Sequence, residues 1–232
     1  TCALPIYEQV ELLGAIVESL LGPDSVVADV GANFGVFTLA LAHALQRCGQ
    51  RATQSDANPN TPRFTPGRVH AFEPQRVLFH MLAGSVALNG LFNVECHHQA
   101  VGDHNGEIEL PQFDYTQPLN FGSIEFGPQQ REKLTQERQH DPARVEYVEL
   151  TTLDRFNWNK LDLLKIDVEG MELAVLAGAE QTIRRCKPVM FVECLKVNRD
   201  ELRQRITDLG YLIYEHSMNF LCVPHQRREQ IT

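Results

Sequence analysis

Residues 24–38 constrain the fold of this chain more than any other stretch. They read Asp-Ser-Val-Val-Ala-Asp-Val-Gly-Ala-Asn-Phe-Gly-Val-Phe-Thr. Residues 25–30 are mostly apolar and β-branched, which predicts a strand buried on both faces of a parallel sheet. A turn containing Gly31 and Gly35 follows, and residues 36–45 predict an apolar helix. A strand, a glycine turn and a helix in this order place backbone N–H groups at the carboxyl edge of a sheet, where open α/β folds bind nucleotides.

The residues within the turn narrow the class of ligand. Dinucleotide sites use the spacing G-x-G-x-x-G, whereas this turn has glycines at 31 and 35 with Asn33 between them. Asp29 lies just ahead of the turn, where its carboxylate would repel a phosphate and favour a cationic ligand. The pattern therefore predicts a site for S-adenosylmethionine, which carries an ammonium group and a cationic sulfur.

The rest of the chain alternates between strand and helix patterns, which predicts right-handed crossovers and a mostly parallel sheet. Further strands are expected at residues 69–74, 93–98, 161–166, 188–193, 211–214 and 219–223, and helices at 6–21, 75–88, 171–185 and 199–209. Residues 49–68 contain several prolines and predict a loop. Residues 107–110 and 145–151 look extended, and the polar stretch 111–144 between them predicts an inserted loop or lid.

The 232 residues suit one α/β domain, with an N-terminal helix within residues 1–22. The net charge of −9 argues against a nucleic-acid partner. The six cysteines show no C-x-x-C spacing, so a reducing compartment is expected, without disulfides or a zinc site built on cysteine. No apolar run has the length of a membrane span and no leader pattern opens the chain, so a cytoplasmic protein without a membrane partner is expected. The oligomeric state is left open.

Five short blocks, in this order, closely resemble the FkbM-type S-adenosylmethionine-dependent methyltransferases over roughly residues 25–195. The blocks are Asp29-Val-Gly-Ala-Asn-Phe-Gly35, Ala71-Phe-Glu-Pro74, Gln99-Ala-Val-Gly-Asp103, Thr151-Thr-Leu-Asp154 and Leu164-Lys-Ile-Asp-Val-Glu-Gly-Met-Glu172. The resemblance implies a Rossmann-like class I methyltransferase fold, with helices on both faces of a seven-stranded, mostly parallel sheet whose last strand is antiparallel. It also implies O-methylation of a hydroxyl on a small molecule or sugar. The proline-containing loop and the 111–144 region depart from the family pattern and leave the acceptor undefined.

The cofactor is expected to lie against the glycine turn. Gly31 and Gly35 let the backbone turn tightly and approach the ligand. Asp29 would pair with the ligand's ammonium group, directly or through water. Asn33 is either a cofactor contact or only a turn residue.

Two further strand ends complete the expected cofactor site. Glu73 ends the second strand, where a carboxylate can accept hydrogen bonds from both ribose hydroxyls, by the logic of the acid in dinucleotide folds. A plain surface glutamate is the alternative. Gln99 and the backbone of Ala100 follow the third strand and are positioned to contact the adenine edge.

Acidic residues at neighbouring strand ends are the candidates for catalysis. Asp167 and Glu169 follow the fourth strand, and Glu193 ends the fifth. Removing the proton of an acceptor hydroxyl needs a base within hydrogen-bond reach, and Asp167 is the first candidate, with Glu169 second. The alternatives are that these acids hold the cofactor or cap the next helix. In a third, less favoured interpretation, they bind Mg²⁺, which prefers oxygen ligands.

Two residues of the blocks are expected to be structural. Asp154 lies in a capping-box pattern and should serve the start of its own helix. Lys165, in a strand, should pair with a nearby acid. At the level of function, the alternatives are a cofactor-binding module that has lost catalysis and an NAD-dependent oxidoreductase, against which the missing glycine at position 33 argues.

Overall fold

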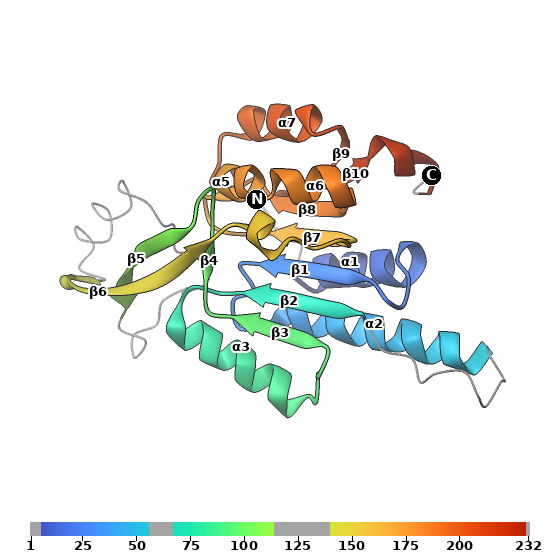
Figure 1. Ribbon diagram of the computed structural model, residues 1–232, viewed down its shortest axis with the longest axis horizontal. Helices are drawn as coiled ribbons and strands as arrows, with labels where there is room; N and C mark the ends of the chain where they lie inside the picture. The colour runs from blue at the N-terminus through green and yellow to red at the C-terminus, as the bar shows by residue number, and fades with distance from the viewer. Residues whose placement is uncertain (1–5, 56–66, 114–139, 231–232) are drawn as a thin grey trace.

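A computed structural model describes residues 6–55, 67–113 and 140–230 (Figure 1). Most of the expected proline-containing loop (56–66) lies outside the described residues, as does most of the expected lid (114–139). Among the described helices, none is both long enough and apolar enough to cross a bilayer.

A seven-stranded sheet forms the centre of the molecule, with the strand order β3-β2-β1-β7-β8-β10-β9 (Figure 1). In that order, the strands are Val94–His97, Arg68–Phe72, Val26–Val30, Leu163–Ile166, Val189–Glu193, Asn219–Pro224 and Tyr211–His216. The pairs from β3 to β8 are parallel, and β10 is antiparallel to both of its neighbours. This confirms the predicted sheet with its last strand reversed.

Helices cover both faces of the sheet because consecutive residues of its central strands are buried and mostly apolar. Val27 of β1 packs with Leu13 and Leu41 on one face, and Ala28 packs with Leu176 on the other. The helices are α1 (Ile6–Leu20), α2 (Val36–Ser55), α3 (Arg76–Leu88), α5 (Glu172–Gly178), α6 (Glu180–Cys186) and α7 (Arg199–Asp208), with short 3-10 turns η2 (Leu153–Phe156) and η3 (His225–Gln230).

The helix after the glycine turn is longer than the sequence predicted. Residues 49–55, expected to begin a loop, continue α2. Arg47 and Arg51 both form ion pairs with Glu18 of α1, at 2.7 and 2.9 Å. These contacts are between two helices, so the local sequence pattern did not reveal them.

A small second sheet, with the order β4-β6-β5, extends from the end of the main sheet (Figure 1). It contains β4 (Ala100–Val101), β5 (Gly106–Phe113) and β6 (His140–Thr151). The two segments expected to be extended are thus strands, and they pair antiparallel over a longer span than predicted. The short strand β4 follows β3 closely in the sequence and pairs in parallel with the end of β6.

Candidate active site

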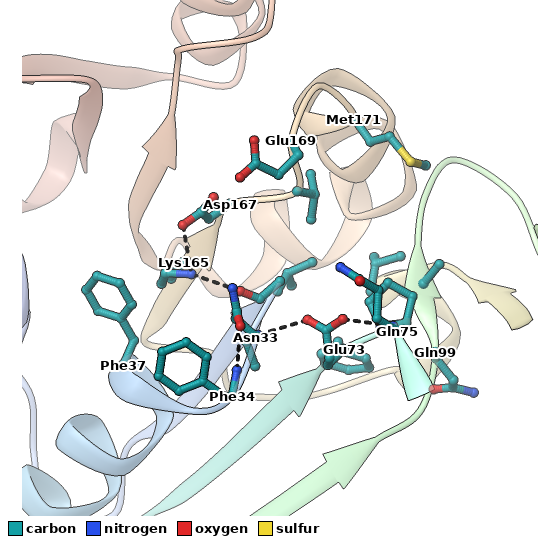
Figure 2. Close-up of a pocket in the computed structure, with 18 of the residues that line it drawn as sticks. Asn33, Phe34, Phe37, Glu73, Gln75, Gln99, Lys165, Asp167, Glu169 and Met171 are labelled. Atoms are coloured by element: carbon teal, nitrogen blue, oxygen red, sulfur yellow. Dashed lines mark hydrogen bonds and ion pairs between the residues drawn. The ribbon is translucent and has the colours of Figure 1, made fainter. Parts of the chain in front are cut away.

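A cavity of about 860 Å³, including its open mouth, lies at the carboxyl ends of β1, β2 and β7. Much of the wall is apolar, and the contributing side chains include Phe34, Phe37, Phe72, Ile108, Leu110 and Met171. Figure 2 shows Glu73, Lys165, Asp167 and Glu169 arranged around this space. Parallel strands end together at this edge, which explains why residues far apart in the sequence meet here.

The glycine turn forms one wall of the cavity. Only glycine fits at the first position of this turn. Gly31 has φ +78°, and a Cβ there would lie 1.8 Å from the backbone oxygen of Asp167. Asn33 also has a positive φ, 54°, and its Oδ1 accepts a hydrogen bond from the N–H of Phe34. Gly31 and Asn33 line the cavity, whereas Gly35, with φ +101°, does not. Gly35 instead leaves space for the packing of α2 against α3.

Glu73 closes the turn with its carboxylate. Its Oε2 accepts a hydrogen bond from the N–H of Asn33 at 2.9 Å, and its Oε1 accepts one from the N–H of Gln75 at 2.8 Å (Figure 2). The side chain is buried, and burial raises the pKa of Glu73 to about 7. The N–H of Asn33, a group that could otherwise bind a phosphate, is therefore already paired with a carboxylate. An anionic ligand at this point would meet the charge of Glu73.

Asp29 does not line the cavity, contrary to its expected contact with a ligand. It is fully buried, and its Oδ2 accepts a hydrogen bond from the Thr38 hydroxyl at 2.6 Å. Its Oδ1 lies 3.1 Å from Lys165 Nζ. Lys165 is therefore the ion-pair partner of Asp29 in this structure, and any effect of Asp29 on a ligand would pass through Lys165 and the turn.

Lys165 was expected to have a structural role, and the structure shows that it also lines the cavity. Its Nζ donates a hydrogen bond to the Gly31 carbonyl at 3.3 Å, lies 3.5 Å from Asp167 Oδ2 and sits over the ring of Phe37. Burial lowers the pKa of Lys165, but the neighbouring carboxylates of Asp29 and Asp167 outweigh that effect and hold it above its usual value. The signal in the sequence was a lysine within a strand that is otherwise apolar, since such a lysine must be paired.

Three carboxylates gather beside Lys165, as expected from their strand ends. One oxygen from each of Asp167, Glu169 and Glu193 lies within 4.8 Å of the others. Asp167 and Glu169 line the cavity, whereas Glu193 does not. Burial, and then the charges of the neighbouring acids, raise the pKa of Glu193 to about 8.

The two candidate bases differ in what holds them. Glu169 has φ +56° and its Oε2 lies 2.6 Å from Lys196 Nζ, so its carboxylate is committed to an ion pair. Asp167 has about a third of its side chain exposed and faces the cavity. Oxygen ligands for Mg²⁺ are present in this cluster, but Lys165 and Lys196 already supply positive charge to it.

Gln99 and Ala100 both line the cavity, on the side of the small sheet. A hydrogen bond from the Gln99 side chain lowers the pKa of Glu149 on β6. In Figure 2 the Gln99 amide points away from Glu73. A contact of Gln99 with adenine therefore stays a prediction, and it would compete with the bond to Glu149.

The sequence analysis missed several lining residues, among them Gln75, Met171 and Phe34. Gln75 is buried behind Glu73, Met171 lies beyond Glu169, and Phe34 is about half exposed at the turn. For Phe34, the available signal in the sequence was an aromatic residue within the glycine turn. Gln75 and Met171 carried none, because they are brought to the cavity by the start of a helix.

Comparisons with known proteins show what the chain is similar to. The sequence model of the methyltransferase FkbM domain matches residues 29–213. Methyltransferase sdnD of Sordaria araneosa is 25% identical over 179 residues, covering 67% of this chain and 60% of the relative. Methyltransferase 1 of Beauveria bassiana is 23% identical over 168 residues, covering 68% of this chain and 59% of the relative. The chain thus spans about 60% of the length of these two relatives.

A solved structure shares the fold. The crystal structure of a methyltransferase FkbM from Methylobacillus flagellatus KT superposes with a TM-score of 0.56 at 16% identity. The match covers 90% of this chain and 47% of that one.

Proposed function

The chain belongs to the FkbM methyltransferase family, and from this premise we propose that it transfers a methyl group from S-adenosylmethionine to a hydroxyl of a small molecule or sugar. The observation that carries the cofactor assignment is the pairing of Glu73 with the N–H of Asn33. A turn closed by a carboxylate suits a cationic nucleoside and is unfavourable for a pyrophosphate. The same pairing argues against the alternative of an NAD-dependent oxidoreductase.

The residues of the cavity fit the proposed cofactor. Gly31, Ala32 and Asn33 line the cavity, so a bound ligand would lie against the backbone of the glycine turn. Each oxygen of Glu73 accepts one backbone hydrogen bond and has a further lone pair for a ribose hydroxyl. When bound, S-adenosylmethionine would supply a methyl group on a cationic sulfur.

Asp167 is proposed to accept the proton of the acceptor hydroxyl. It faces the cavity, and its contact with Lys165, at 3.5 Å, is longer than the contact of Glu169 with Lys196, at 2.6 Å, which leaves the Asp167 carboxylate less committed. Holding the acceptor oxygen in line with the methyl group would supply much of the rate gain. Ile108 and Leu110 border the cavity on the side of the small sheet, where we propose that the acceptor binds.

A comparison of ligands tests the cofactor class. S-adenosylhomocysteine should raise the melting temperature of the chain and bind in calorimetry, whereas NAD should do neither, because a ligand that binds the native state stabilises it. Glu73→Ala should strongly weaken the binding of S-adenosylhomocysteine. Glu107→Gln, which changes an exposed residue, should leave that binding unchanged. A larger effect of NAD would overturn the assignment. Binding without methyl transfer to any hydroxyl acceptor would instead favour a cofactor-binding module that has lost catalysis.

A further inference from the structure

A second cluster of polar side chains lies away from the proposed methyl-transfer chemistry, on β2 and β3. Figure 1 shows these two strands side by side, with β3 at the edge of the main sheet. The register pairs His70 with Glu95 and Phe72 with His97. Because side chains alternate along a strand, His70, Glu95 and His97 point to the same face of the sheet. Two imidazoles and a carboxylate are thus brought together by strand pairing alone.

The ligand atoms of these residues converge. His70 Nδ1 lies 3.2 Å from His97 Nε2 and 3.4 Å from Glu95 Oε2, and the three atoms all lie within 4.8 Å of one another. In a tetrahedral zinc site with bonds near 2.0–2.1 Å, neighbouring ligand atoms are about 3.3 Å apart. Two of the three separations therefore match the edge of such a tetrahedron.

We propose that His70, Glu95 and His97 form a binding site for one Zn²⁺ ion. Two histidines and one glutamate are a known ligand set for zinc, with water in the fourth position. Water can reach this position, because the Glu95 side chain is 47% exposed at the edge of the sheet. Without a metal, the two facing imidazole nitrogens must share one proton, with one as donor and the other as acceptor. The Zn²⁺ ion would take the place of that proton.

Neighbouring groups hold the three ligands in these orientations. The His70 ring packs on Trp158 with ring centres 4.7 Å apart, and the His97 ring stacks on Phe72 at 4.5 Å. Arg68 binds Glu95 Oε1 at 2.9 Å, which leaves Oε2 directed at His70. Outer contacts of this kind orient metal ligands in known sites.

The site borders the cofactor cavity without being part of it. Phe72 lines the cavity and its ring stacks on His97, and the N–H of Glu73 donates a hydrogen bond to the His97 carbonyl at 3.1 Å. None of the three proposed ligands lines the cavity. Metal binding can therefore be measured independently of methyl transfer.

Zn²⁺ titration of the full chain by calorimetry tests this proposal, after chelator treatment and removal of any polyhistidine tag. One Zn²⁺ per chain should bind and raise the melting temperature. Affinity should fall at least about tenfold in His97→Gln and Glu95→Gln, because each removes a ligand. His104→Gln is the matched control, because this exposed histidine also contacts a carboxylate, that of Asp103 at 2.7 Å. Glu193→Gln controls for binding at the acid cluster, and both controls should keep the wild-type affinity.

Substitution with Co²⁺ gives a second readout, because a tetrahedral site produces intense visible absorption that an octahedral one does not. Glu95→Gln changes a half-exposed side chain and should fold, so this variant still tests the site if His97→Gln does not fold. Equal Zn²⁺ affinity in the wild type and both ligand variants would overturn the site, as would an octahedral Co²⁺ spectrum. In either case, the two histidines would form only a hydrogen-bonded pair.

Discussion

Lys165 Nζ lies 3.1 Å from Asp29 Oδ1 inside the sheet, and the two side chains are only 2% and 0% exposed. The register of β1 and β7 sets these residues directly opposite each other. Lys165 also contacts the Gly31 carbonyl and Asp167. One buried cation therefore links the strand before the glycine turn, the turn itself and the candidate base.

We expect Lys165→Met to lower the free energy of unfolding by about 3–5 kcal/mol, because it leaves the buried Asp29 carboxylate without the opposite charge of Lys165. Urea denaturation measures the loss. Lys160→Met is the matched control: Lys160 pairs with Asp24 at 2.8 Å on the surface and should contribute less than about 1 kcal/mol. Equal losses in the two variants would contradict a special role for the buried pair.

This ion pair also shows why the site could be predicted only in part. The strand and glycine turn at residues 24–38 are local patterns, and the structure has them where they were expected. Whether Asp29 faces a ligand or the interior depends on its neighbour across the sheet, Lys165, which lies 136 positions later. The pairing of β1 with β7 is a long-range contact, so the local sequence of the turn does not predict it.

Asp154 gives a second example, and there the prediction was wrong. Its capping-box pattern predicted that it would serve its own helix, but the N-cap of η2 has no side-chain hydrogen bond. Asp154 instead accepts hydrogen bonds from the N–H groups of Gln181 and Thr182, at the start of α6. Aspartate is a good capping residue, as predicted, but tertiary packing decides that Asp154 caps α6 and not η2.

Gly31→Ala should destabilise the chain by more than about 1 kcal/mol and abolish binding of S-adenosylhomocysteine, because the new Cβ would overlap the Asp167 carbonyl and the residue has a positive φ. Gly84→Ala is the control within α3, where a Cβ meets nothing within 4 Å. That change should stabilise the helix by about 0.5–1 kcal/mol. Thermal melts and calorimetry measure both effects, and normal binding by Gly31→Ala would contradict the packing argument.

The raised pKa of Glu73 should make stability depend on pH. The folded protein holds the Glu73 proton up to about pH 7, whereas the unfolded chain releases it near 4.5, so the folded state binds more protons between these values. The free energy of unfolding should therefore fall as pH rises through this window, by up to about 3 kcal/mol from this group. Denaturation at pH 5 and pH 8 measures the fall. It should be smaller in Glu73→Gln, and an unchanged fall would assign it to other groups.

The same residue should make cofactor affinity depend on pH in the opposite direction. If the Glu73 carboxylate accepts ribose hydroxyls, the affinity for S-adenosylhomocysteine should rise as pH increases through about 7, since the ionised form is the stronger acceptor. Calorimetry at pH 6 and pH 8 measures this change. Glu73→Gln should bind more weakly and with little dependence on pH. A wild-type affinity that is constant over this range would count against the ribose contact.

Asp167→Asn separates catalysis from binding. The amide keeps the shape of the carboxylate but cannot take a proton, so we expect methyl transfer to slow by about 10²–10⁴-fold while S-adenosylhomocysteine affinity changes little. Lys165 keeps its closer partner, Asp29, so the fold should persist. Glu169→Gln is the comparison, since its carboxylate is held by Lys196 at 2.6 Å and its loss should slow transfer less. Single-turnover rates with a hydroxyl acceptor measure both variants. A larger loss in Glu169→Gln would move the base to that residue, and weakened binding without slower transfer would make Asp167 a cofactor contact.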